Sequence, residues 1–231
     1  MKKIASLSFL LTGLFLLASS AALASGLQYE VTITNLTRGQ PFSPTAVIIH
    51  DSQMEPIFTL GEPSSEGIWS IAESGNTGPL VAALAGNPHI YDLQVTDGPF
   101  LPGTSVTVTL DGGNGFADKE LSLAGMLGKT NDSFFALNGV NVPGFLPFFQ
   151  RTYTEVFMAD AYDAGSELNN ELCDYVGGCG AGLRMTNGAE GYVYVSSGFH
   201  VGDPSHGLDP TVLDWNNPVA KITVRVVRNR H

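Results

Sequence analysis

The segment YDAGSE, residues 162–167, carries two acidic side chains four positions apart, Asp163 and Glu167. Carboxylate oxygens are ligands that calcium prefers, but the ion takes about six to eight oxygens in all. Two acids are therefore too few, and another segment has to supply a third. Asp132, at the start of the aromatic run SFFAL (133–137), is a candidate donor. On spacing alone, however, YDAGSE is more typical of a turn or of one helical turn than of a metal site.

A second oxygen-rich segment is DGGNGFAD, residues 111–118, with Asp111, Asn114 and Asp118. Its spacing differs from that of an EF-hand loop, which has oxygen ligands at alternate positions and a closing Glu. The Asn-Gly pair is typical of a tight hairpin turn, because glycine and asparagine tolerate positive φ. We therefore interpret this segment as a turn.

Two histidines and two aspartates share the loop at 198–209, and imidazole and carboxylate groups bind transition metals. The spacing specifies no coordination geometry, so this loop supports only an alternative hypothesis, a secreted hydrolase or carbohydrate-active protein. The sequence has no G-x-S-x-G elbow, no H-E-x-x-H and no phosphate-binding glycine loop. We therefore expect a protein that is not an enzyme. The four residues of the alternative are His200, Asp203, His206 and Asp209.

The chain begins with MKK, an apolar stretch and Ala22-Leu23-Ala24, which is the pattern of a signal peptide over residues 1–24. A retained membrane anchor is the other interpretation. We expect residues 25–231 to form a single exported domain, periplasmic or secreted, with no transmembrane segment after cleavage. The formal charge of −11 argues against nucleic acid as a partner, because phosphate backbones repel such a chain.

The two cysteines, Cys173 and Cys179, lie in CDYVGGC. Export to an oxidising compartment favours a disulfide that closes a small loop. A zinc site would need further Cys or His residues beside them.

Short alternating segments separated by Gly, Pro, Asn and Asp predict an all-β, antiparallel sandwich or barrel. Apolar residues at helical spacing predict two short helices, at 65–75 and 78–86, with Ser64 or Ser65 as the first cap and Gly75 as the end. The expected strands are 29–37, 45–50, 56–60, 90–95, 104–110, 119–127, 133–137, 152–158, 191–197 and 221–227.

Several short motifs occur in one order along almost the whole chain, over residues 28–228. They are Ser43-Pro44, His50-Asp51, Ser65-Glu66-Gly67, Ala72-Glu73-Ser74-Gly75, NDSFFALNG (131–139), YDAGSE and DWNNPVAKITV (214–224). In this order the chain resembles the spondin-type domain of F-spondin-like matrix proteins. Its opening, YEVTITNLTRGQPFSP, is more similar to stand-alone bacterial members.

The resemblance implies a β-sandwich related to C2 domains, with one Ca²⁺ held by carboxylates at one end. Carried over by position, the ligands are Asp132, Asp163 and Glu167. Two positions depart from the family pattern, because Ser133 stands where a Trp is usual and Glu167 is one methylene longer than Asp. We expect structural calcium in an adhesion or interaction module. The partner would be an extracellular or envelope protein or a glycan.

Overall fold

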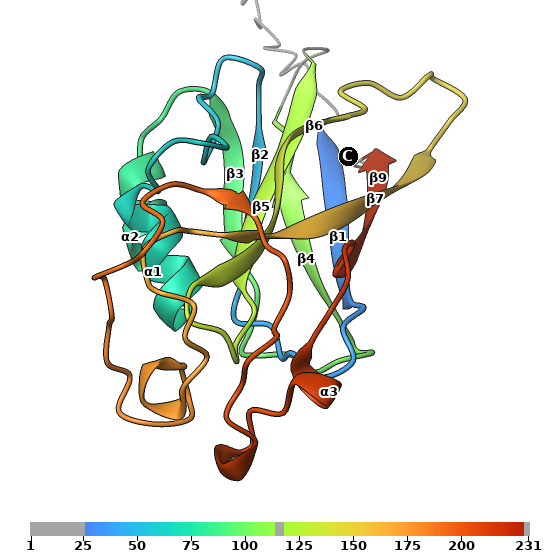
Figure 1. The fold of residues 1–231 in the computed structure, drawn as a ribbon. Helices are drawn as coiled ribbons and strands as arrows, with labels where there is room; N and C mark the ends of the chain where they lie inside the picture. The colour runs from blue at the N-terminus through green and yellow to red at the C-terminus, as the bar shows by residue number, and fades with distance from the viewer. Residues whose placement is uncertain (1–25, 114–117, 229–231) are drawn as a thin grey trace, which may run out of the picture.

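The computed structural model describes residues 26–113 and 118–228. Its nine strands are all antiparallel to their neighbours, in the order β3-β2-β5-β6-β7-β9-β1-β4, with β8 paired to β7 (Figure 1). The fold is therefore mostly antiparallel β-structure with a few short helices, as expected. The strands are β1 Leu27–Asn35, β2 Ala46–His50, β3 Ile90–Val95, β4 Ser105–Asp111, β5 Lys119–Met126, β6 Ser133–Val142, β7 Thr152–Asp163, β8 Tyr194–Val195 and β9 Ala220–Arg228.

The longest strand, β7, connects two sets of strands. Its residues 152–159 pair with β9, and its last four residues, 160–163, pair with β6. At the ends of the path, β3 and β4 approach each other without forming a ladder. There the Asp92 carboxylate accepts a hydrogen bond from the Asp111 amide (2.8 Å).

Both predicted helices are confirmed. Helix α1, Glu66–Ser74, begins after Ser65, whose hydroxyl accepts a hydrogen bond from the Ile68 amide (3.3 Å), and ends at Gly75 with φ 68°. The left-handed backbone at Gly75 suits glycine, which has no Cβ to clash. The second helix is α2, Gly78–Leu84, and three shorter helical turns follow: η1 Cys173–Tyr175, η2 Pro204–His206 and α3 Pro210–Leu213.

The core has two apolar clusters. The larger one contains the inward side chains of β1, where buried and half-buried residues alternate, together with β9 and much of β5. Within it, the rings of Phe42 and Phe135 stack with centroids 4.1 Å apart. The smaller cluster lies under α1, which contacts β5 and β6 and buries Ile68 and Ile71. The helical pair thus covers a sheet face that would otherwise expose apolar side chains (Figure 1).

One predicted strand is wrong. Residues 56–60 form an irregular segment, although Ile57 and Phe58 are buried as their apolar character requires. The side chain of Asn138 takes the place of a partner strand. It accepts a hydrogen bond from the Ile57 amide (3.0 Å) and donates one to the Phe58 carbonyl (2.8 Å). The strand expected at 191–197 is reduced to the two residues of β8.

Residues 1–24, interpreted above as a signal peptide, lie outside the described residues. Across 26–113 and 118–228, there is no helix with the length and apolar character needed to cross a membrane.

Candidate metal centre

The topology brings two of the three predicted acids to one end of a strand pair. Strand β6 begins at Ser133 and its neighbour β7 ends at Asp163, and these two residues are opposite each other in the ladder. Asp132 directly precedes Ser133, and its carbonyl accepts a hydrogen bond from the Ala164 amide (3.0 Å). The side chains of Asp132 and Asp163 therefore belong to the same end of the molecule, although 31 positions separate them in sequence.

Glu167, the third predicted acid, is held at this end by hydrogen bonds from its segment to the Asp132 carboxylate. One of its oxygens, Oδ2, accepts hydrogen bonds from the Ser166 amide (2.7 Å), the Glu167 amide (2.9 Å) and the Ser166 hydroxyl (3.1 Å). These bonds fold residues 163–167 over Asp132. The other oxygen, Oδ1, is buried and has no hydrogen-bond partner.

Asp163 is held from both sides. Its Oδ1 accepts a hydrogen bond from the Gly165 amide (2.8 Å), and its Oδ2 accepts one from the side chain of Asn169 (2.7 Å). Gly165 has φ 62°, and a Cβ built there would lie 2.2 Å from the Tyr192 carbonyl oxygen. The bend therefore requires glycine for both its backbone angle and the close approach of the neighbouring chain. This is the bend that YDAGSE needs for its two acids to converge.

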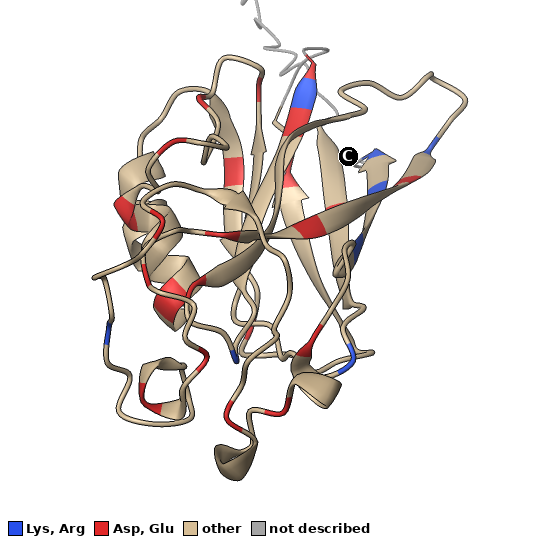
Figure 2. Cartoon of the chain, in the orientation of Figure 1, with Lys and Arg blue, Asp and Glu red and all other residues tan. Residues whose placement is uncertain are grey.

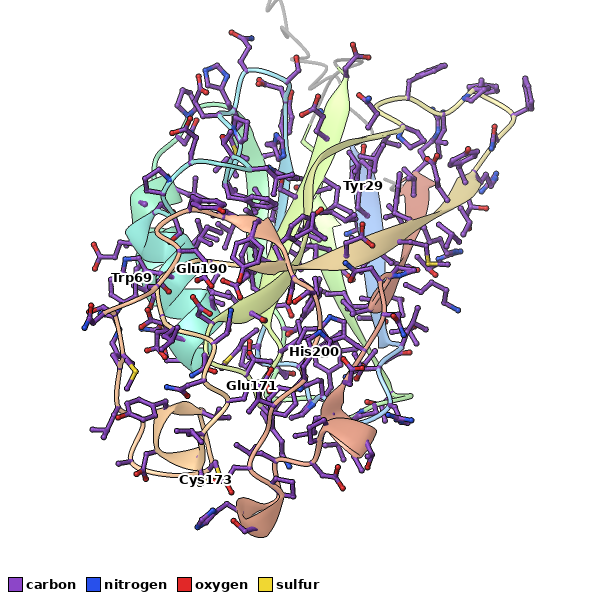
Figure 3. The ribbon with its side chains drawn as sticks, viewed as in Figure 1. Tyr29, Trp69, Glu171, Cys173, Glu190 and His200 are labelled. Atoms are coloured by element: carbon purple, nitrogen blue, oxygen red, sulfur yellow. A yellow bond between two sulfur atoms is a disulfide. The ribbon has the colours of Figure 1, made fainter. Side chains whose placement is uncertain are left out.

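Glu167 is also buried, and its two oxygens differ. Oε1 faces the Arg184 guanidinium at 3.5 Å, whereas Oε2 has no hydrogen-bond partner. Arg184 pairs more closely with Glu73 of α1 (2.5 Å) and lies over the Trp69 ring, 4.8 Å from its centroid. Figure 3 shows Trp69 and Glu190 on this side of the molecule. The arginine thus neutralises one edge of the acidic group and leaves the buried oxygens uncompensated.

The three carboxyl groups resist ionisation in the ion-free protein. Burial raises the pKa of Asp132 to about 6, although the Ser166 and Glu167 hydrogen bonds oppose the rise. Burial, followed by the charge of Asp132, raises the pKa of Asp163 to about 7. Burial, followed by the charges of Glu73 and Asp132, raises the pKa of Glu167 to about 7. Each group is therefore costly to ionise where it lies, since a buried charge needs compensation.

A cation would supply that compensation, and the donor set fits a hard one. Two buried oxygens, Asp132 Oδ1 and Glu167 Oε2, have no partner, and the pKa values of all three carboxyls are raised together. Among the residues that the structure describes, however, there is no group of three or more His, Cys, Asp or Glu side chains already arranged to hold a metal ion. The predicted ligand set therefore remains a prediction. Its members lie at one end of β6 and β7 but do not form a finished coordination shell.

The glycine-rich segment at 111–118 behaves as a turn where it is described. The Asp111 carboxylate accepts a hydrogen bond from the Gly113 amide (2.8 Å), which is a local turn contact. Asn114 lies outside the described residues.

The histidines of the 198–209 loop form separate pairs. His206 lies 2.9 Å from the Asp203 carboxylate, while His200 lies 3.8 Å from that of Asp214. Asp209 accepts a hydrogen bond from the Thr211 amide (2.9 Å) at the start of α3. These contacts keep the polar groups of the loop in local pairs, so they provide no observation in favour of a hydrolytic site here.

The predicted disulfide is confirmed, since Cys173 and Cys179 are bonded with Cα atoms 5.2 Å apart. Beside it lies a feature that no pattern in the sequence predicted. Glu171 has φ 53°, and its carboxylate accepts hydrogen bonds from the amides of His200, Val201 and Gly202. Figure 3 shows Glu171 and His200 close together at this end of the molecule. Glu171 therefore ties the histidine loop to the segment that follows the candidate metal centre.

A histidine–serine pair is a second unexpected feature. His50 Nε2 lies 2.8 Å from the Ser122 hydroxyl, and both side chains are buried. The Gly139 amide also donates to that hydroxyl (2.8 Å), at an irregularity in the pairing of β5 with β6. The pair satisfies polar groups between strands, which is a structural role.

In comparisons with known proteins, no protein-family model matches the sequence and no curated protein matches it.

Proposed function

We propose that this chain is an exported calcium-binding module, built as an antiparallel β-sandwich of the C2-like, spondin type, in which calcium has a structural role. Its activity would be adhesion or interaction with an extracellular or envelope protein or a glycan, rather than catalysis. The apolar leader at 1–24, the disulfide and the acidic composition are consistent with export. The motif order and the all-β architecture support the resemblance, and the candidate metal centre supports the cation.

The observation that carries the proposal is the pair of buried carboxylate oxygens without partners, Asp132 Oδ1 and Glu167 Oε2. A buried charged group with no partner costs several kcal/mol, so folded proteins pair or neutralise such groups. Protonation is one solution, and the raised pKa values favour it at low pH. At neutral pH and above, a bound cation is the solution that also uses Asp163.

Calcium fits this donor set better than a transition metal does. The group consists of three carboxylates, and the side chains in contact with Asp132 and Asp163 are the Ser166 hydroxyl and the Asn169 carboxamide; none of these residues offers a thiol or an imidazole. Hard oxygen donors of this kind select calcium or magnesium, and calcium accepts the more irregular geometry. The longer Glu167 side chain can offer both oxygens to one ion, which would offset the departure from Asp.

In this proposal, neighbouring residues of the protein hold the three carboxylates in place before an ion binds. Asp132 already holds the amides of Ser166 and Glu167, so it orders the loop before any ion arrives. Gly165 provides the bend, and Asn169 orients the Asp163 carboxylate. A bound ion would neutralise the three carboxylates and pin the segment 163–169 to the start of β6. Because the ion binds only the folded chain, it would raise stability by mass action.

The test is a thermal melt of the purified chain in EDTA, followed by calcium titration at pH 8. Calcium at a hundred times its Kd stabilises a folded protein by about 2.7 kcal/mol. For a chain of this length that corresponds to a rise in Tm of roughly 5–11 °C. Magnesium at the same concentration should give a smaller rise, because it requires a tighter octahedral site.

The matched variants are Asp163→Asn and Glu55→Gln. Glu55 is exposed and far from the carboxylates in the sequence, so its variant should keep the full calcium response. Asp163→Asn should lose most of the response. A Tm that calcium leaves unchanged in the wild-type protein, with isothermal titration calorimetry showing no binding, would refute the proposal.

A further inference from the structure

The loop between β6 and β7 exposes two large aromatic side chains. Phe148 is 94% exposed and Phe149 is 87% exposed, the two highest values among the large apolar residues that the structure describes. The loop, residues 143–151, projects from the body of the molecule (Figure 1). A phenyl ring in water is costly, so adjacent exposed rings are a recognised mark of an interaction surface.

The base of this loop is firmly held. Leu146 is buried in the core, and the Arg228 guanidinium donates hydrogen bonds to the carbonyls of Leu146 and Pro147. The Tyr29 hydroxyl donates to the Pro143 carbonyl (2.6 Å), on the other side of the loop. A turn then forms where the Gln150 amide donates to the Pro147 carbonyl (2.8 Å). The two phenyl rings are therefore presented outward by an ordered turn, with little entropy left to lose on binding.

The loop lies in a stretch of this acidic chain that lacks acids. No Asp or Glu occurs between Asp132 and Glu155, although the chain has 22 of them. The charged residue of the loop is Arg151, which is exposed beside the phenyl rings. Figure 2 shows acidic residues over much of the ribbon, whereas the loop between β6 and β7 carries none. A surface that carries phosphate groups would meet least repulsion here.

The place where β1 begins also favours a lipid surface at this end of the molecule. Leu27, the first residue of β1, is opposite Arg228 in the β1–β9 ladder, and Arg228 holds the loop. The sequence that precedes β1, with its apolar stretch at residues 4–24, therefore joins the molecule beside the aromatic loop. Under the alternative interpretation given above, a retained anchor, this stretch would hold this end of the domain at a lipid surface.

The area that the two phenyl rings can bury distinguishes a bilayer from a protein partner. Two phenyl rings bury at most about 300–500 Å² in total. A stable protein–protein interface, including one between two copies of this chain, buries about 1,200–2,000 Å². A short loop does not supply that area, whereas a bilayer accepts single aromatic side chains at the level of its headgroups.

We propose that the loop 143–151 docks on a lipid bilayer surface, with Phe148 and Phe149 inserted at the headgroup level and Arg151 beside lipid phosphates. Strand β6 runs from the candidate metal centre to this loop, and its ten residues span about 30 Å. The lipid contact and the carboxylates therefore occupy opposite ends of the molecule. Attachment by two rings is weak and reversible, since even a single myristoyl chain gives only marginal binding.

The experiment measures co-sedimentation of the host-processed protein with phosphatidylcholine vesicles and with phosphatidylcholine–phosphatidylglycerol vesicles, in EDTA. The double variant Phe148→Ser/Phe149→Ser should bind on the order of tenfold more weakly than the wild type. The control is Leu101→Ser, which removes another exposed apolar side chain (64% exposed) from a different loop. It should bind as the wild type does. Both variants change exposed residues, and a melt checks that each is folded.

A second readout reports the loop directly, whether or not the leader has been removed. In the Phe148→Trp variant, tryptophan emission should shift to the blue with vesicles, and brominated lipids should quench it more than they quench the wild type. Equal quenching in both proteins would overturn the proposal. So would vesicle binding that the double serine variant retains in full. If that variant instead abolishes self-association or capture of a protein partner while vesicle binding is absent throughout, the loop is a protein-docking surface and the lipid proposal is wrong.

Discussion

The sharpest prediction concerns Asp132→Asn. The carboxamide oxygen can keep the three hydrogen bonds that Asp132 Oδ2 now accepts, while the amide nitrogen takes the place of the unpartnered Oδ1. The substitution therefore removes a buried charge without changing the size of the side chain. In the ion-free protein this should be stabilising, because the charge it removes has no compensating partner on that side.

The magnitude follows from the pKa. Folding raises the pKa of Asp132 from 3.8 to about 6, a difference of about 2 units. At about 1.36 kcal/mol per unit, ionised Asp132 costs roughly 3 kcal/mol of stability above pH 7. In EDTA at pH 8, Asp132→Asn should raise Tm by roughly 6–12 °C for a chain of this length.

In saturating calcium the sign should reverse, because the variant has lost a ligand. Thermal melts of wild type and variant, each in EDTA and in calcium, give the four Tm values that are compared. If Asp132 is only a structural hydrogen-bond acceptor, the variant will be less stable than the wild type in both conditions. A lower Tm for Asp132→Asn in EDTA would therefore refute the reasoning about buried charge.

Three further predictions follow from other contacts. Because folding raises the pKa values of Asp132 and Asp163, the folded chain holds protons that the unfolded chain has released. Ion-free stability should thus fall as pH rises from 5 to 8, and melts in saturating calcium should show this fall reduced or absent. Replacing both Cys173 and Cys179 by Ser should cost about 2 kcal/mol, measured by urea unfolding, since the disulfide closes a short loop. Glu171→Gln should cost roughly 1–3 kcal/mol and increase amide hydrogen exchange at 200–202, whereas unchanged exchange there would contradict its role as the anchor of that loop.

Most of the regular structure was accessible from the sequence because local patterns determine it. Alternation predicted β1 and β9, and the Ser65 and Gly75 caps predicted the limits of α1. The failure at 56–60 has a specific cause. Its apolar residues are buried, as a strand's would be, but the side chain of Asn138, some 80 positions away, satisfies the backbone. Periodicity reports burial and does not identify the hydrogen-bond partner.

The candidate site, too, could be predicted only where its features are local in the sequence. The two acids of YDAGSE and the glycine between them are visible in the sequence, so this segment could be identified as a candidate. The proximity of Asp132 depended on a strand pairing that the sequence does not show, and the motif order supplied it only as an expectation. The contributions of Arg184 and Glu73 depend on packing between α1 and a distant loop, so no pattern in the sequence predicted them.

The divided pairing of β7 has a consequence for how the molecule comes apart. Its first eight residues are paired with β9, whereas its last four, 160–163, are paired with β6, and Tyr162 and Asp163 also with the two residues of β8. The candidate metal centre is attached to this short section. Without an ion, the end of β7 is therefore the place where fraying should begin, and the opening would stop where the β9 ladder takes over. The two parts of β7 should therefore differ in local stability, so that opening at the carboxylate end can occur without unfolding of the whole domain.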